Sequence, residues 1–418
     1  MAIEAVSFNR ISGYYATRGL TPPVKKQENI ASLDARNVAY HVPNGLNLNM
    51  NYMQADMIDL TPHDPLDVGK AESYKLKINK GEVSLSDVDI SVAMSQAFAD
   101  DPDSPIKKMR ILFMPQNRMI IEGTMQKSFL KIPFQIQGKI DGAGDNFLNL
   151  VTDKIKVWNI PVKSAMDLLG LKLGTFIKLS DPGGKFFISG NNVFFSPTKF
   201  TDAPAIIGNV NGARTDAGHL AIVFGESRDK GPRPATLPTP PPPSPMNYLN
   251  LKGGNVEFEG TLIKDPDVTL LDKTPNTPLD FLNAKERIEL VNKGEVTIPE
   301  KTLKDMVIGG DIGLNSPNMT VQPGKSVVTG KLWIFPLKFS LVFGKTPDGQ
   351  LTVTPKDGKV LGFIPIPSSM LRSNIQKTMP GSQTYGDSVI LDLMKMNNIG
   401  LGPLKEVVNA PNGLVLKI

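Results

Sequence analysis

The side chains that most often carry enzymatic chemistry are few in this sequence, and their spacing points away from a catalytic centre. Its three histidines, His41, His63 and His219, stand in unrelated contexts without a partner at metal-ligand or triad spacing. The absence of cysteine excludes thiolate catalysis, disulfide scaffolds and cysteine-based zinc sites. The acidic run from Asp100 to Asp103 could hold calcium weakly, but such a run is typical of a solvated turn. We therefore expect a protein that is not an enzyme and has no catalytic residue, bound metal or cofactor.

Two glycine-containing stretches resemble nucleotide-binding loops only in part. Residues 324–326 (Gly-Lys-Ser) match the end of a phosphate-binding loop, but Met319 stands where the first glycine belongs. Residues 142–144 (Gly-Ala-Gly) fall at an expected strand-to-strand turn, whereas a dinucleotide fingerprint needs a strand followed by a helix. Basic residues are scattered and the formal net charge is +5, so no nucleic-acid partner is expected. A charge of this size permits a weak attraction to anionic lipid head groups.

The elements that would position a site follow from a tandem duplication. Thr61–Asp67 matches Thr274–Asp280, and Lys80–Val83 matches Lys293–Val296. Both matches lie 213 positions apart (274 − 61 and 293 − 80). Two matches in one register predict two homologous modules. The length of 418 residues agrees with this, because it exceeds what one hydrophobic core usually serves.

The predicted modules cover residues 41–230 and 248–418, with a linker at 231–247 and an N-terminal arm at 1–40. The linker contains a proline-rich run at 238–245, which favours polyproline II and a semi-rigid spacer. A ligand for an SH3-type domain is the alternative for this run. The arm shows no counterpart in the second module, and it could be disordered, a docking peptide, or a strand that crosses to the other module.

Within each module the hydrophobic period changes in a fixed order. Apolar residues alternate with asparagines at 46–50, which predicts a strand with one buried face. Ser86 then caps a short helix that carries Leu85, Val88 and Val92, with Phe98 as a further candidate. The counterpart of this helix begins at Glu300, and its inward residues are expected to be Leu303, Met306 and Val307.

The longest predicted helix of each module follows a meander of strands. In the first module its apolar stripe steps by three and four residues through Val162, Ala165, Met166, Leu169, Leu173, Phe176 and Ile177. The counterpart in the second module uses Ile366, Met370, Leu371 and Ile375. A final pair of strands ends each module.

This order of elements resembles the tubular lipid-binding (TULIP) superfamily, and two such modules resemble the bactericidal/permeability-increasing proteins. The resemblance extends from about Leu46 to Ile418, and its long helices are introduced by residues 160–162 (Ile-Pro-Val) and 364–366 (Ile-Pro-Ile). It implies an α+β fold with two tandem, elongated and highly curved antiparallel β-barrel modules, each wrapped around a long apolar helix. It also implies that acyl chains lie against that helix and the inward strand faces.

The resemblance assigns the acyl-chain contacts to apolar residues of both modules. In the first module they are Phe134, Ile136, Val162, Met166, Leu169, Leu173 and Phe176. In the second module they are Phe339, Leu341, Met370, Leu371 and Ile375. The predicted function is non-enzymatic binding or transfer of lipid, with phospholipid or fatty acid as the partner. The alternative is a structural or scaffolding protein with closed cores, in which packed side chains cover the helix stripe and no groove is open.

The sequence also predicts where the protein is found. Residues 1–15 lack the basic start and apolar run of a secretory signal, and no stretch approaches the ~18 apolar residues of a membrane-spanning helix. We expect a protein that is cytoplasmic or peripheral to a membrane, or periplasmic if this chain is a mature fragment.

Overall fold

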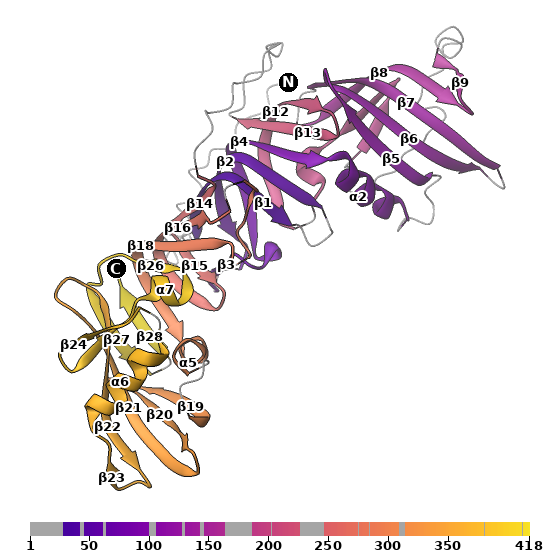
Figure 1. Cartoon of the computed structure of the whole chain (residues 1–418). Coiled ribbons are helices and arrows are strands. Elements are labelled where there is room, and N and C mark those ends of the chain that lie inside the picture. Colours follow the sequence, from indigo (N-terminus) through magenta and orange to yellow (C-terminus); the bar gives the residue numbers. More distant parts are fainter. Residues whose placement is uncertain are drawn as a thin grey trace, which may run out of the picture.

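The described part of the chain is mostly antiparallel β-sheet with few helices (Figure 1). The computed structural model describes residues 28–418 except 42–45, 62–63, 100–105, 128–129, 143–145, 164–185, 202, 226–245, 275, 284, 309–313, 380 and 412. Predictions for the arm up to residue 27, most of the linker, His63 and the acidic run therefore fall outside the described residues.

A long, partly curled sheet forms the middle of the molecule (Figure 1). Its main path runs β12-β13-β4-β2-β1-β14-β16-β18-β28-β27. The strands of this path are β1 (Ile30–His41), β2 (Asn47–Asp59), β4 (Tyr74–Ser86), β12 (Ala205–Asp216), β13 (His219–Gly225), β14 (Tyr248–Lys252), β16 (Thr261–Asp272), β18 (Arg287–Pro299), β27 (Glu406–Ala410) and β28 (Gly413–Lys417). Short strands beside the path are β3 (Leu66–Asp67), β15 (Asn255–Phe258), β17 (Leu279–Asp280) and β26 (Ile399–Leu401).

Two smaller sheets lie at opposite ends of the bent molecule (Figure 1). The first outer sheet contains β5 (Ile106–Met114), β6 (Arg118–Lys127), β7 (Leu130–Gly142), β8 (Leu148–Val157), β9 (Ile160–Pro161), β10 (Phe186–Ser189) and β11 (Asn192–Phe195). The second contains β19 (Asn315–Gln322), β20 (Lys325–Leu332), β21 (Phe335–Lys345), β22 (Leu351–Val360), β23 (Ile364–Pro365), β24 (Gln383–Tyr385) and β25 (Ser388–Ile390). Both sheets pair their strands in the same order, so the repeated sequence forms repeated sheet modules.

The repeat extends to single hydrogen bonds. The Asp59 carboxylate accepts the backbone N–H of Thr61 at 2.7 Å, and the Asp272 carboxylate accepts that of Thr274 at the same distance. Such short aspartate turns end a strand and direct the chain back toward the sheet. The bounds of β18 also equal those of β4 shifted by 213 positions (287 − 74 and 299 − 86).

The two halves meet in a strand pair that is nearly symmetric. Strands β1 and β14 pair antiparallel with Leu33 opposite Leu251. Two short parallel strand pairs flank them, and each pair joins the two halves. Strand β17 of the second half pairs with β1, and strand β3 of the first half pairs with β15. This is the self-complementary arrangement of a twofold dimer interface, built here within one chain. The sheet therefore continues from one half into the other, and β1, most of which falls in the expected arm, lies at this seam.

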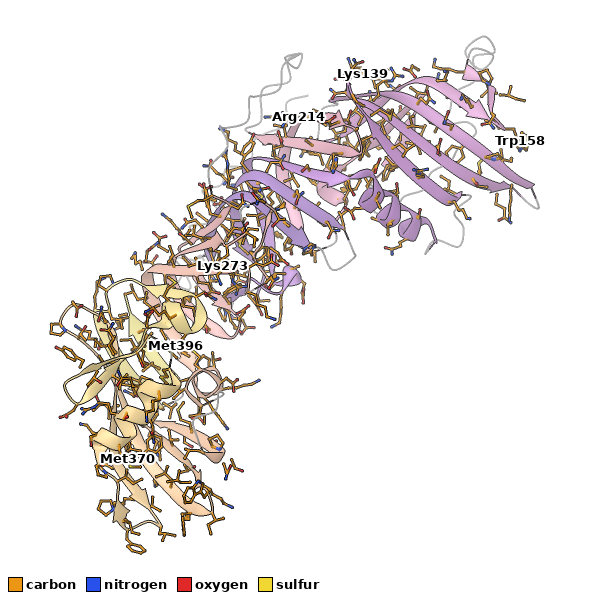
Figure 2. All side chains as sticks on the ribbon, in the orientation of Figure 1. Lys139, Trp158, Arg214, Lys273, Met370 and Met396 are labelled. Atoms are coloured by element: carbon orange, nitrogen blue, oxygen red, sulfur yellow. The ribbon has the colours of Figure 1, made fainter. Side chains whose placement is uncertain are left out.

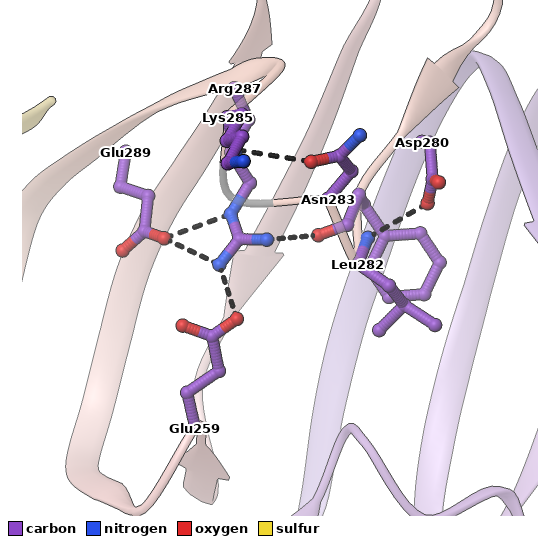
Figure 3. Close-up of polar contacts among 8 residues, drawn as sticks. Glu259, Asp280, Leu282, Asn283, Lys285, Arg287 and Glu289 are labelled. Atoms are coloured by element: carbon purple, nitrogen blue, oxygen red, sulfur yellow. Dashed lines mark hydrogen bonds and ion pairs between the residues drawn. The ribbon is translucent and has the colours of Figure 1, made fainter.

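A buried arginine supports the second half at the seam (Figure 3). The side chain of Arg287 is fully buried; its Nε donates to Glu289 at 2.8 Å and its terminal nitrogens donate to Glu259 and to the Phe281 carbonyl, both at 2.8 Å. The ring of Phe281 stacks on Tyr40 of the first half, with 5.8 Å between centroids. A buried guanidinium needs such partners because an unpaired buried charge is strongly unfavourable.

The repeated Lys-Gly-Glu-Val motif lies where the long strands bend. A Cβ atom on Gly81 would lie 2.9 Å from the Tyr52 carbonyl oxygen, and Gly294 has a φ of 142°. Register shifts between β2 and β4 and between β16 and β18 mark β-bulges beside these glycines. Bulges bend a strand and increase its twist, so the motif serves the curvature of the sheet.

Four α-helices occur among the described residues: α2 (Asp87–Ala99), α5 (Glu300–Ile308), α6 (Ser368–Thr378) and α7 (Leu393–Asn397). Two short 3₁₀ helices, η1 (Ala71–Ser73) and η2 (Pro197–Lys199), complete the helical elements of this part. None of the described helices combines the length and apolar character needed to cross a membrane. The expected long apolar helix of the first half falls on residues 164–185, outside the described part.

The predicted cap of α2 is confirmed, but two of the apolar residues that the sequence assigned to this helix are exposed. The Ser86 hydroxyl accepts the N–H of Asp89 at 3.0 Å. Val88 and Val92 are 67% and 47% exposed, whereas Ile90 and Met94 are buried. Each pair is spaced by four residues, so periodicity alone does not choose between the two faces. In α5 the inward face is as predicted, because Leu303 and Val307 are buried and Met306 packs against the core.

Candidate functional site

The candidate site is an apolar cavity between α6 and the second outer sheet. Alternation along β21 directs Leu337, Phe339 and Leu341 toward the same side, and all three line the cavity. Helix α6 covers it with residues spaced by four, Leu371 and Ile375. The other lining residues are Val307, Ile308, Leu314, Asn374 and Met379. The chemistry of such a site is the burial of apolar surface, with the Asn374 amide as its polar group.

A glycine in β22 lets α6 approach the sheet. A Cβ atom on Gly358 would lie 2.7 Å from the nearest methyl carbon of Leu371, and the Gly358 carbonyl accepts the N–H of Ile366 at 2.8 Å. Strand β22 therefore holds the segment that leads into α6. Its glycine also leaves room for the side chain of Leu371, which lines the cavity.

Four of the five residues predicted in the second half come together at this cavity: Phe339, Leu341, Leu371 and Ile375. The fifth, Met370, is 53% exposed and lies on the outside of α6 (Figure 2). Adjacent helix residues point about 100° apart, so Leu371 and Met370 cannot both face the sheet. The helix has 11 residues, and its remaining positions are largely exposed. It is thus shorter and more amphipathic than the long apolar helix that the sequence predicted.

The first half is described only in part at the corresponding place. Phe134 and Ile136 are buried on one face of β7, and Val162 is partly buried against the core. The other predicted contacts, Met166, Leu169, Leu173 and Phe176, lie outside the described residues.

A second apolar cavity lies in the first half, beside the central sheet, and was not predicted. It measures about 30 Å³, and its lining includes Met50, Met53, Phe200 and Phe224. Tyr40 also lines it, and burial raises the pKa of this phenol, which lies 3.5 Å from the hydroxyl of Tyr74. The alternation of apolar residues at 46–50 indicated this strand face, but the partners on β12 and η2 are distant in the sequence.

Both cavities are small in this structure. The cavity under α6 measures about 50 Å³, and small-molecule sites typically reach ~300–1,000 Å³. Since one water needs ~10–15 Å³ of such volume, the cavity has room for only a few waters and is far smaller than an acyl chain. A long apolar ligand does not fit into either cavity as it stands.

Comparison with known proteins gives no relative. No protein-family model matches the chain, and neither the curated proteins nor the solved structures contain a significant match. Among the described residues, no group of three or more histidine, aspartate or glutamate side chains could hold a metal ion. The functional argument therefore rests on the shape and chemistry of the described sites.

Proposed function

We propose that the chain is a non-enzymatic lipid-binding protein that takes up one acyl chain of a fatty acid or phospholipid between α6 and β21. The observation that supports this is the apolar cavity lined by Phe339, Leu341, Leu371 and Ile375. The resemblance to tubular lipid-binding proteins suggested acyl-chain contacts at these same positions.

Uptake requires α6 to swing away from the sheet. Leu371 and Ile375 attach the helix to the cavity, and burial of two such side chains contributes roughly 3–6 kcal/mol. Each methylene of an entering chain contributes ~0.8 kcal/mol, so roughly four to eight methylenes would offset the lost contacts. An acyl chain of ordinary length exceeds this, which makes exchange of the helix contacts for ligand contacts energetically feasible.

One observation favours the alternative of a scaffolding protein with closed cores. The cavity measures only about 50 Å³, and Leu371, which lines it, is 6% exposed. A scaffold needs no opening of α6. The two functions therefore differ in whether α6 moves, and this can be tested directly.

The test uses a disulfide to tie the segment that leads into α6 to β22, which restricts the movement of the helix at its N-terminal end. The chain has no cysteine, so a pair introduced by Gly358→Cys and Ile366→Cys would have no other cysteine of the same chain to bond with. A Cβ on residue 358 would lie 3.3 Å from that of Ile366, close to the ~3.8 Å of natural disulfides. Uptake of a fluorescent fatty acid is measured for the wild type, the double variant and each single variant, with and without reductant.

We expect the oxidised double variant to lose uptake and the reduced form to regain it, while both single variants bind in either condition. Equal uptake by the oxidised and reduced double variant would contradict entry under α6. A wild-type chain that takes up no fatty acid, and that shows no bound lipid in native mass spectrometry and organic extraction, would refute the carrier and leave the scaffold.

A further inference from the structure

Exposed aromatic and aliphatic side chains lie in two turns at one end of the second outer sheet. Strand β23 marks this end of the sheet in Figure 1. Trp333 and Ile334 form the turn between β20 and β21 and are 79% and 78% exposed, and Phe363 in the turn between β22 and β23 is 74% exposed. The two turns are neighbours, because the N–H of Leu361 donates to the Pro336 carbonyl at 2.9 Å. We call this surface the apolar tip; it consists of Trp333, Ile334, Phe335, Leu361, Phe363 and Ile364.

The backbone of the apolar tip is unfavourable for the residues that it carries. Trp333 and Leu361 have φ angles of 59° and 57°, in the left-handed region where hairpin turns normally place glycine or asparagine. The first half repeats the arrangement: Trp158 has a φ of 49°, is 51% exposed, and donates its N–H to the Pro133 carbonyl at 3.0 Å. Trp158 lies at the far end of the first outer sheet (Figure 2).

Both tryptophans of the chain therefore occupy strained, solvent-facing turns at the two ends of the molecule. Folding alone would favour smaller residues at these positions. Strain and exposure together indicate side chains that serve an external contact.

Lysines surround the base of the apolar tip. Lys338 of β21 lies directly opposite Lys359 of β22. Lys331 of β20 pairs with Pro336, which lies two residues nearer the tip along β21 than Lys338. All three lysines are exposed. In the part of the chain that the structure describes, none of the three forms a salt bridge. Like charges on opposing strand positions are destabilising, and an anionic partner would relieve the repulsion. Asp357, two residues before Lys359, does not cancel the positive charge of this end.

We propose that the apolar tip inserts into the interfacial region of a lipid bilayer that contains anionic phospholipid. Tryptophan and aliphatic side chains are stabilised at the head-group level, and lysines around them contact lipid phosphates while their stems lie on apolar surface. The tip has only six apolar side chains, whereas a stable protein interface uses ~20–30 residues a side. A twofold pairing of two tips would also bring their lysines together. A bilayer can accept a small apolar area, and its anionic head groups complement the charge of the lysines.

Vesicle flotation tests this proposal. The wild type is compared with the variant Trp333→Ser/Ile334→Ser on vesicles of phosphatidylcholine with phosphatidylserine and on pure phosphatidylcholine. The control is Val88→Ser/Val92→Ser, which removes two exposed apolar side chains from α2, far from the tip. We expect the tip variant to lose about tenfold or more of its partitioning and the control to bind as the wild type does.

Two further measurements sharpen the result. In a Trp158→Phe background the emission of Trp333 should shift to the blue on vesicles, and Lys338→Gln/Lys359→Gln should remove the preference for phosphatidylserine. Unchanged flotation of the tip variant, or no emission shift, would overturn the proposal. Light scattering without vesicles gives one further outcome. If the wild type is a dimer and the tip variant is a monomer, the proposal is overturned and the tip is assigned to contact with a second copy. Uptake of fatty acid from solution should be unaffected in the tip variant, so this proposal and the acyl-chain site can fail separately.

Discussion

Replacement of Arg287 by methionine should destabilise the seam more than any surface change. The side chain is fully buried, and it donates to Glu289, to Glu259 and to the Phe281 carbonyl. Removing one partner of a buried ion pair typically costs ~3–5 kcal/mol. Glu259 is 56% exposed and recovers hydration, so we expect the lower end, about 3 kcal/mol. Methionine keeps most of the buried volume, and the loss is therefore mainly that of the polar contacts.

Calorimetry and denaturant unfolding measure the effect. For a unit of ~150–250 residues, about 3 kcal/mol corresponds to a melting temperature lower by roughly 6–12 °C. The repeat supplies a matched second variant, because the positions of Arg287 and Glu289 correspond to Tyr74 and Leu76 in the first half at the spacing of 213. The variant Arg287→Tyr/Glu289→Leu removes both charges and should recover part of the lost stability. A melting temperature of Arg287→Met within about 2 °C of the wild type would refute the reasoning.

Three other predictions follow from the geometry. Gly358→Ala places a methyl group 2.7 Å from Leu371, so α6 should pack less well, with a stability loss of about 1 kcal/mol in thermal unfolding; unchanged stability would contradict the close approach. Trp333→Gly should raise stability by about 1 kcal/mol while weakening vesicle binding, because glycine accepts the left-handed turn; a destabilised variant would show that the indole supports the fold. Burial raises the pKa of Tyr74, so its folded form keeps its proton at a pH where the unfolded form loses it. Stability should therefore fall as pH rises above ~10, and Tyr74→Phe should flatten this slope in urea unfolding; an unchanged slope would assign it to other groups.

The sequence correctly grouped residues that share a face where periodicity and chain proximity carry the information. Alternation in β21 identifies Phe339 and Leu341 as residues of one face, and the four-residue spacing identifies Leu371 and Ile375 as one helix face. The same reasoning does not reveal how far the helix lies from the strand. That distance decides between an open groove and a cavity of about 50 Å³, and it depends on Gly358 in another strand.

The sequence by itself determined the duplication and the local signals. Two motifs at one spacing predicted repeated modules, and Ser86 predicted the start of a helix. These features depend on residues close together in the chain or on direct comparison of its halves, so they can be read without knowing which distant segments meet.

Only the tertiary structure decided which faces are buried and how the halves join. Val88 and Val92 share a helix face as well as Ile90 and Met94 do, but only packing against β5 shows which pair is inside. The pairing of β1 with β14 joins strands more than two hundred positions apart, and strand partners at such separation are chosen by the whole sheet. The apolar tip likewise combines two turns that the sequence separates, because hairpin geometry brings their ends to one edge of the sheet.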